Sequence, residues 1–412
     1  MWVLKAAIVS GLLLPPTLAN RLYLPPVYHN GSVEVENFSV PGNLDGFKMK
    51  TPANTTSFDF WYFDAFSRNT SAAINIVFFN TGNFAANPHP LTVQISGTFD
   101  NGTQFSGEAL ASEGAFITND ESGITGNWLG SGASFYGTNL EKPNVEYVVK
   151  LNSPSIGVRG TFKLKSVSDS LSNSIISSTA NLSTPAARTT PLSLQPQLTD
   201  GVGYHDKNWG DASVITSPKY WDWGHASLGP YSLVWYDLLD YNNTEHVYAY
   251  ISKNGNLMHN NCAEKAVEVR QWGANATYPP TSGIATNEGL TARFDLGGGQ
   301  AFVANLTKEV IIHDQIVYAR ALGSVTGGIE GQEQYQGRGA YEEYVYGLLP
   351  RMRIRKDVVD PRVLWRMRST TNQYRYHHVL DNLIPATENA KASPSVSGVF
   401  GVLGIRLFHF VC

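Results

Sequence analysis

Short apolar runs that end at turn-forming residues limit how this chain can fold more than any other feature. Runs rich in Val, Ile, Phe, Tyr and Thr recur along most of the sequence, separated by Gly, Asn and Pro. Asn101-Gly102 and Asn254-Gly255 are typical of tight hairpin turns. Before residue 349, no segment combines the apolar period of a helix with helix caps. The pattern predicts an all-β chain of two antiparallel domains, each a barrel or a sandwich. The clearest strands are expected at Ala73–Phe79, Leu91–Phe99, Val145–Leu151, Tyr231–Leu239, His246–Ile251, Ala301–Leu306 and Val310–Ala321.

Composition divides the chain into segments. Residues 1–19 are typical of a secretory signal peptide, because Lys5 precedes a short apolar run and Ala19 ends a small-residue cleavage site. Residues 166–200 are dense in Ser, Thr and Pro, and we expect a linker or long loop there. This segment would join an N-terminal β domain at 20–165 to a C-terminal β domain at 201–348. In the arginine-rich stretch 349–412 the recurring strand pattern of short apolar runs is missing. We expect this stretch to be a divergent basic tail.

The signal peptide predicts a glycoprotein of the secretory pathway, either secreted or held in an endomembrane or vacuolar lumen. The apolar run of the signal is too short to span a bilayer, so no membrane span is expected. The net charge of −4 does not indicate a nucleic-acid partner, because such proteins usually carry an excess of positive charge. Cys262 is expected to be a small buried hydrophobe, and the oligomeric state stays open. The sequons for N-glycosylation are at Asn30, Asn37, Asn54, Asn69, Asn101, Asn181, Asn242, Asn275 and Asn305.

Four of the nine tryptophans lie between Gly203 and Trp235, interleaved with histidine, lysine, aspartate and asparagine. Indole rings with a few oriented polar groups are typical of the wall of a small-molecule pocket. The alternative is an aromatic β core beside polar surface loops. Within this segment, Asp206 and Asp211 are expected to cap turns rather than to act in catalysis.

Motifs of the common catalytic machineries are missing from the sequence. There is no G-x-S-x-G elbow, H-E-x-x-H helix, dinucleotide-binding glycine pattern or P-loop. His377-His378 lacks metal-ligand spacing. The adjacent Glu342 and Glu343 would point to opposite sides of a strand, and we expect both to be solvated. The sequence therefore predicts chemistry that uses no metal and no cofactor.

Three blocks carry a family resemblance: Phe58–Asp64, the tryptophan-rich segment with Gly229–Tyr231, and Tyr335–Glu342. In this order, over Val33–Tyr346, they resemble the fungal Diels–Alderase family, relatives of the hydroxyneurosporene-hydratase and AttH-like proteins. The resemblance implies two lipocalin-like β domains with a substrate pocket between or inside them. It also implies a pericyclase that performs a [4+2] cycloaddition in fungal secondary-metabolite biosynthesis.

The secretory features favour one branch of this family, the hetero-Diels–Alder coupling of a tropolone-type quinone methide with a humulene-type alkene. Decalin-forming intramolecular cyclisation is the first alternative. A terpenoid hydratase or lyase and a secreted carrier of apolar small molecules are the others. In every case the expected partner is a small apolar polyketide or terpenoid.

Strand alternation suggests which side chains meet that substrate. Phe58, Tyr62 and Asp64 share one strand face, and Trp61 and Phe63 share the other. We predict that the first set faces the pocket. The alternative is that Trp61 and Phe63 face it instead. The expected catalytic residues are His205, Lys207 and His225, each with a modest effect through a hydrogen bond to a polarised carbonyl; the two histidines could instead be structural. The expected substrate contacts are Phe58, Tyr62, Asp64, Tyr204, Trp209, Trp223, Tyr231 and Trp235, with Trp209 and Trp223 together in one cavity where the domains meet.

Overall fold

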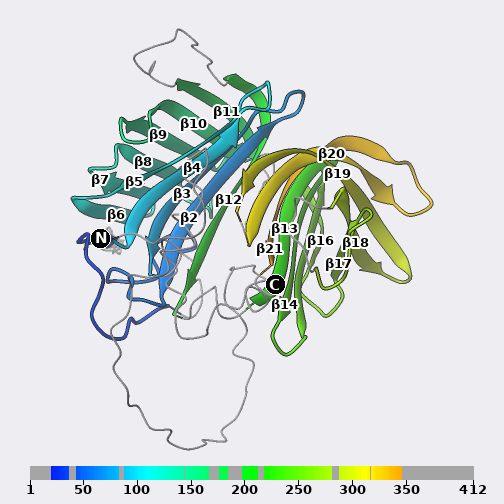
Figure 1. Cartoon of the computed structure of the whole chain (residues 1–412), viewed down its shortest axis with the longest axis horizontal. Helices are drawn as coiled ribbons and strands as arrows, with labels where there is room; N and C mark the ends of the chain where they lie inside the picture. Colours follow the sequence, from blue (N-terminus) through cyan, green and yellow to red (C-terminus); the bar gives the residue numbers. More distant parts are fainter. Residues whose placement is uncertain are drawn as a thin grey trace, which may run out of the picture.

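The computed structural model describes residues 20–36, 43–82, 88–142, 144–166, 176–183, 197–211, 218–280, 287–315 and 317–345, with backbone alone for 176–183 and 197–200. The predicted signal peptide and basic tail lie outside the described residues. The predicted all-β fold is confirmed: the described residues form two antiparallel sheets and no helix (Figure 1). No described helix is therefore long and apolar enough to cross a membrane.

The first sheet has twelve strands among the described residues, in the order β1-β6-β7-β8-β9-β10-β11-β12-β2-β3-β4-β5. It folds over, so that β6–β10 lie behind β2–β5 (Figure 1). Its strands are β1 (Asn20–Leu24), β2 (Phe58–Ser67), β3 (Ala73–Thr81), β4 (Leu91–Thr98), β5 (Gln104–Leu110), β6 (Gly114–Asp120), β7 (Gly123–Leu129), β8 (Ala133–Thr138), β9 (Glu146–Ser153), β10 (Val158–Ser166), β11 (Ile176–Ser183) and β12 (Gln197–Gly210).

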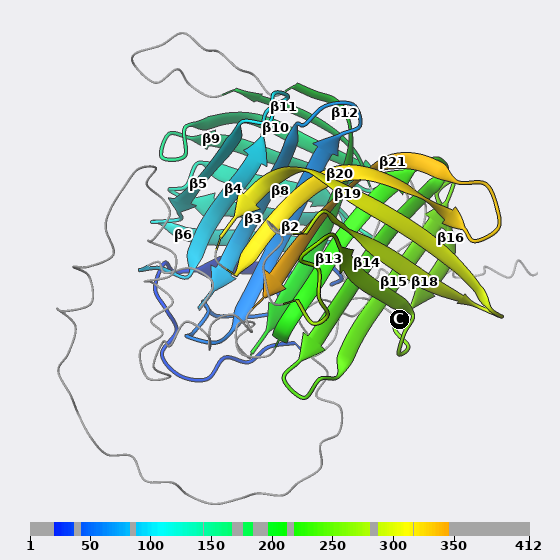
Figure 2. The ribbon, with the colours of Figure 1, turned by 45° about the vertical axis from the view of Figure 1, so that its right-hand side comes forward.

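The second sheet has nine strands among the described residues, in the order β16-β15-β14-β13-β21-β20-β19-β18-β17. It lies beside β2 and β12 of the first sheet (Figure 2). Its strands are β13 (Pro218–Leu228), β14 (Tyr231–Asp240), β15 (Glu245–Lys253), β16 (Asn256–Asn261), β17 (Val267–Trp272), β18 (Gly289–Gly297), β19 (Gln300–Asp314), β20 (Tyr318–Ile329) and β21 (Tyr335–Val345).

The stretch expected to link the domains instead contributes strands to the first sheet. β11 pairs with β10 and β12, and β12 continues past residue 200 to pair with β2 along residues 201–210. The sheet boundary therefore falls after Gly210, later than the sequence predicts. Threonine is a good strand former, so a Ser/Thr-rich composition does not oppose strand pairing.

Two further details differ from the sequence-based expectations. The strand expected at Val310–Ala321 is split, because β19 ends at Asp314 and β20 begins at Tyr318. Cys262 is exposed and disulfide-bonded, rather than a buried hydrophobe.

Alternating side chains sort most of the core into three layers, and Tyr220, Leu239 and Val345 form a small separate cluster. The first layer fills the N-terminal domain and includes Trp61, Phe63 and Tyr147. The second lies between the domains, and the third fills the C-terminal domain. The interdomain layer comprises Phe58, Phe60, Tyr62, Phe66, Ala73, Val77, Phe79, Val202, Tyr204, Trp221, Trp223, Val234, Tyr236, Leu238, Tyr248, Tyr250, Ile312, Leu322 and Ala340. β2 contributes side chains to the first two layers. On β12, Tyr204 and His205 point to opposite faces and are both buried, so both strands are buried on both faces.

Gly224 shows how tightly the C-terminal layer is packed. It lies opposite Trp235 in the β13–β14 register. A Cβ atom at Gly224 would lie 2.3 Å from the Trp235 ring and 2.8 Å from the Ala340 backbone oxygen. The indole therefore packs over a position where only glycine fits.

Candidate active site between the two β domains

Buried polar side chains gather in the aromatic interdomain layer. β2 presents Tyr62 and Asp64, and β12 presents Tyr204 and Asp206 from the neighbouring strand. From the second sheet, β13 presents Trp223 and His225, in register with Glu342 and Ala340 of β21. β20 adds Arg320, opposite Glu342. We call Tyr62, Asp64, His225, Tyr318, Arg320 and Glu342 the interdomain polar cluster.

Asp64 and His225 form its first half. The His225 Nε2 atom lies 2.9 Å and 3.1 Å from the two Asp64 carboxylate oxygens. The Tyr62 hydroxyl donates to Asp64 Oδ2 at 2.7 Å. His225 is fully buried, and its ring stacks with that of Tyr204 at 5.3 Å. This carboxylate fixes the orientation of the imidazole and leaves Nδ1 as the atom that can exchange a proton.

Arg320 and Glu342 form the second half. The Arg320 guanidinium donates to the Glu342 carboxylate, and the Tyr318 hydroxyl donates to the same carboxylate at 2.8 Å. The guanidinium also lies over the Tyr62 ring, 5.0 Å from its centroid. Burial raises the pKa of Tyr62 well above 10, so its hydroxyl stays protonated.

Several buried side-chain nitrogen atoms in this region have no hydrogen-bond partner among the described residues. They are Trp223 Nε1, His225 Nδ1, and Arg320 Nε and Nη1. Buried polar groups in proteins are nearly always hydrogen-bonded, to protein, water or ligand. The Trp223 ring also packs edge-on against Tyr62 and Tyr204, at 5.4 Å and 5.0 Å. The arrangement suits a ligand with an aromatic or unsaturated body and at least one oxygen atom.

Asp206 lies within β12 and does not cap a turn, which corrects the sequence-based expectation. It is half-buried and in register with Tyr62, and its Oδ1 atom accepts a hydrogen bond from the Asn208 amide at 2.6 Å. Burial raises the pKa of Asp206 to about 7, although the neighbouring His205 lowers it. The interdomain face therefore holds a carboxyl group that is partly protonated at neutral pH.

The structure separates the residues that the sequence grouped into one site. Phe58, Tyr62, Asp64, Tyr204, Trp223 and His225 come together between the domains. Tyr231 and Trp235 lie instead in the interior of the C-terminal domain. The aromatic cavity predicted to hold both Trp209 and Trp223 does not form, because Trp209 lies on the other face of β12 and donates its Nε1 hydrogen to the Glu36 carbonyl.

His205 and Lys207 also point into the N-terminal domain, away from His225. His205 Nε2 lies 3.1 Å from Asp45 Oδ1, and its ring stacks on Phe63 at 4.4 Å. Lys207 pairs with Asp59 and lies over the Trp61 ring, 3.4 Å from its centroid. Burial lowers the pKa of Lys207 well below its ordinary value. Both side chains have polar partners within the core of this domain, which favours a structural role.

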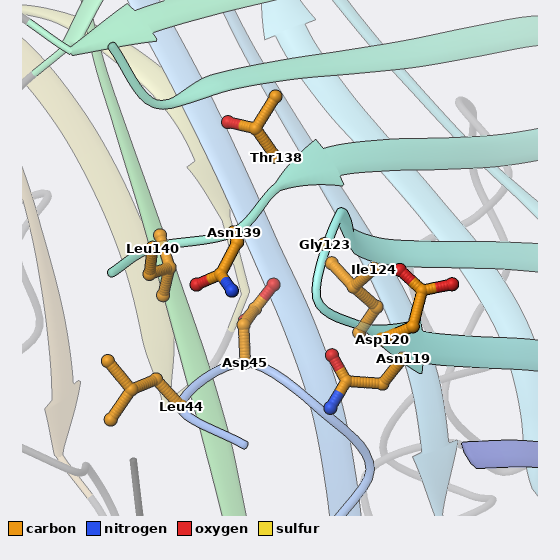
Figure 3. A pocket seen from close by; sticks show the side chains of 9 residues that line it. All are labelled: Leu44, Asp45, Asn119, Asp120, Gly123, Ile124, Thr138, Asn139 and Leu140. Carbon is orange, nitrogen blue, oxygen red and sulfur yellow. The ribbon is translucent and has the colours of Figure 1, made fainter. Parts of the chain in front are cut away.

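A pocket opens beside His205 and its partner Asp45, at the end of the N-terminal domain (Figure 3). Its empty volume is about 250 Å³, part of which is open solvent. Asp45 lines it, and that carboxylate also accepts the Tyr147 hydroxyl at 2.7 Å. The other lining residues are Leu44, Asn119, Asp120, Gly123, Ile124, Thr138, Asn139 and Leu140. The lining is mostly polar, and it lies apart from the interdomain aromatic layer.

Tyr318, Arg320 and Glu342 are the members of the interdomain polar cluster that sequence reasoning missed, and Asp206 beside the cluster was missed as well. Glu342 and Glu343 were expected to be solvated, but they are 7% and 1% exposed. Their opposite directions along β21 were predicted correctly, yet both faces of that strand are buried. A charged residue in an otherwise apolar strand was the available signal. Among the described residues, no three His, Cys, Asp or Glu side chains converge as metal ligands.

Comparison with known proteins places the chain in a family. Residues 34–278 match the model of the Diels-Alderase-like family. The quinolone epoxide rearrangement protein penF of Penicillium thymicola is 38% identical over 352 residues, which cover 81% of this chain and 97% of that protein. The quinolone epoxide rearrangement protein asqO of Emericella nidulans is 36% identical over 360 residues, which cover 82% and 98%.

A solved structure shares the fold. The crystal structure of CghA with Sch210972 superposes with a TM-score of 0.64 at 17% identity, covering 79% of this chain and 98% of that chain. The resemblance predicted from the sequence blocks is thereby confirmed. The chain belongs to the Diels-Alderase-like family, and this membership supports an enzyme that catalyses a cyclisation or a rearrangement.

Proposed function

We propose that this protein isomerises an epoxide on an aromatic secondary metabolite, and that a quinolone epoxide is the substrate class. The names of two relatives aligned over nearly their whole length support the reaction class. The observation that carries the proposal within this chain is the buried Asp64–His225 pair, enclosed by aromatic rings between the domains.

An epoxide rearrangement needs a proton donor for the oxygen, a site that tolerates positive charge on carbon, and a base that takes the last proton. Aromatic faces stabilise a nearby cation, more strongly when water is excluded. Tyr204 and Trp223 offer such faces, and both are buried. A site that excludes water also protects the cation from capture by water.

The Asp64–His225 pair fits the role of base. A hydrogen on Nε2 is held by the carboxylate, which leaves the lone pair of the neutral ring on Nδ1. After Nδ1 takes a proton, the adjacent carboxylate compensates the new charge. Nδ1 has no partner among the described residues, so it is available to a bound substrate.

The test is incubation of the purified protein with an epoxide-bearing quinolone, followed by chromatography and mass spectrometry. We expect a product of unchanged mass that lacks the epoxide, because a rearrangement gains and loses no atoms. Heat-denatured protein provides the control. A diol, heavier by one water, would instead indicate a hydrolase, and no conversion above buffer would refute the proposal.

Hetero-Diels–Alder coupling of a quinone methide with an alkene is the second candidate function. The specific support is Arg320, a buried cation with two N–H groups that lack partners among the described residues. Such donors polarise a carbonyl, which accelerates a cycloaddition. An assay with a tropolone-type quinone-methide precursor and a humulene-type alkene separates the candidates, since only this function joins two molecules into one adduct.

We also propose that the protein passes through the secretory pathway and carries N-glycans. Six sequon asparagines are exposed: Asn30, Asn69, Asn101, Asn242, Asn275 and Asn305. The exposed disulfide-bonded Cys262 is consistent with an oxidising compartment. Asn37 and the side chain of Asn181 lie outside the described part of the chain.

Asn54 provides an internal control for glycosylation. It is half-buried, and its side-chain amide donates to the Gly31 carbonyl at 2.9 Å, so we expect it to stay unmodified. Peptide mapping after expression in a fungal host should find glycans at several of the six exposed sites. Six unmodified sites in a chain that keeps Met1 would contradict secretion.

A further inference from the structure

We propose that Asp206 is the proton donor of this site and gives its proton to the epoxide oxygen, while His225 takes the proton released later. The inference rests on the proposed function. It assigns the role of acid to Asp206 and the role of base to His225, which β12 and β13 bring to the interdomain layer from opposite sheets.

The three carboxyl groups near this face have different partners. Asp64 is bound to His225, and Glu342 is bound to Arg320. Asp206 forms no ion pair with any described side chain, and the polar groups that interact with its carboxyl, the Asn208 amide and the Tyr204 hydroxyl, are both neutral. Of the three, Asp206 is therefore the carboxyl with the least support for a permanent negative charge.

The surroundings of Asp206 keep part of the population protonated at neutral pH. Burial is the largest effect and raises the pKa of Asp206 to about 7; Asp64 and Glu342, which face it between the domains, raise it further. His205, on the other face of β12, and the Asn208 hydrogen bond work in the opposite direction. A general acid with a pKa near the working pH transfers protons efficiently.

Asp206 also shares a strand face with the aromatic rings of the interdomain layer. It is in register with Tyr62, and Tyr204 is two residues before it on the same strand face. The Tyr204 ring stacks with that of His225 at 5.3 Å. Tyr204 therefore lies between the proposed acid and the proposed base, and a flat substrate packed on this ring would meet both.

The proton and electrons balance as follows. Asp206 protonates the epoxide oxygen, and one C–O bond breaks with its electron pair going to that oxygen. A neighbouring group then migrates with its bonding electrons to the cationic carbon. The new cation loses one proton to His225 Nδ1, which gives an isomer of the substrate. Proton exchange with solvent returns His225 to its neutral form and Asp206 to its acid form.

The decisive variant is Asp206→Asn, which keeps the size of the side chain and removes the proton donor. With an epoxide-bearing quinolone, we expect kcat to fall by about 10²–10⁴-fold with little change in KM. The alkaline limb of the pH–rate profile near pH 7 should disappear, and Asp206→Glu should recover part of the rate. Glu146→Gln, an exposed carboxylate on β9, provides the matched control.

Activity of Asp206→Asn within threefold of the unmodified protein, with the same pH profile, would overturn the inference while leaving the proposed function intact. No conversion by the unmodified protein would refute the proposed function instead. A substrate-independent measurement keeps the two apart. Carbon NMR of the aspartate carboxyl groups should show one that titrates near pH 7 and is lost in Asp206→Asn, and titration of that group below pH 5 would contradict its role as the acid.

Discussion

Turnover of a quinolone epoxide should fall by about 10²–10⁴-fold when His225 is replaced by alanine, because the variant loses the proposed base for the final proton. Substrate binding should change little, since the surrounding aromatic rings remain. The sequence alone predicted a loss of at most about 10²–10³-fold for this residue, through one hydrogen bond to a polarised carbonyl. The structure supports a larger upper limit, because His225 is fully buried and bonded to Asp64 at 2.9 Å.

The chain offers a matched control for this variant. His246 on β15 also pairs with a carboxylate, at 3.3 Å from Asp240, but its side chain is 36% exposed. His246→Ala should therefore leave turnover unchanged. Added imidazole should partly restore His225→Ala, because it can occupy the vacated space beside Asp64. A folded His225→Ala protein, checked by its melting temperature, that retains activity within threefold would exclude His225 as the base.

Asp222→Asn should stabilise the protein at alkaline pH. Asp222 is fully buried in the interior of the C-terminal domain, and neither carboxylate oxygen has a hydrogen-bond partner among the described residues. It lies in register with Asp237 on one side and Glu343 on the other. An asparagine amide has nearly the same shape, carries no charge, and can donate to these neighbouring carboxylates.

The pH dependence follows from the direction of the pKa shifts. Burial raises the pKa of Asp222 well above its ordinary value, and raises that of Glu343 to about 8. In the unfolded chain both groups titrate near pH 4. The folded-state pKa values are higher than the unfolded-state values. The stability that the protonated Asp222 and Glu343 carboxyl groups contribute is therefore complete below about pH 4, and it is lost as the pH rises towards 8.

Thermal unfolding at two pH values measures this effect. Asp222→Asn should raise the melting temperature by several degrees near pH 8.5, at roughly 2–4 °C per kcal/mol, and by little near pH 5. Asp295→Asn, an exposed carboxyl on β18, should change neither value appreciably. A melting temperature for Asp222→Asn that is lower than that of the unmodified protein at both pH values would show that the charge is compensated in the folded state.

Local patterning predicted the fold because turns and strand alternation depend on adjacent residues. Asn254-Gly255 forms the predicted tight turn, with φ values of 51° and 79°. Alternation in β2 correctly placed Tyr62 and Asp64 on the face opposite Trp61. Their role as substrate contacts stays a prediction.

Assembly of the site could not be predicted, because it depends on strand pairing and domain contact over long separations. Asp64 and His225 are 161 residues apart in sequence. The tryptophan-rich segment looked like one site because its aromatic and polar residues are close in sequence. In the structure, successive residues of β12 face different layers, so Tyr204 and His205 belong to different environments. If only one face of β12 were buried, the side chains on its other face would be exposed. Composition could not reveal that both faces of β12 are covered.

The two-sided burial of β2 and β12 gives protein engineers a simple parity rule. On both strands the even-numbered side chains face the interdomain layer, from Phe58 to Phe66 and from Val202 to Asn208. Odd-numbered positions such as Phe63 and His205 instead support the N-terminal domain. Under the proposed function, mutant libraries restricted to even positions should vary substrate scope. A single-residue insertion in either strand would exchange the two sets and disturb both layers together.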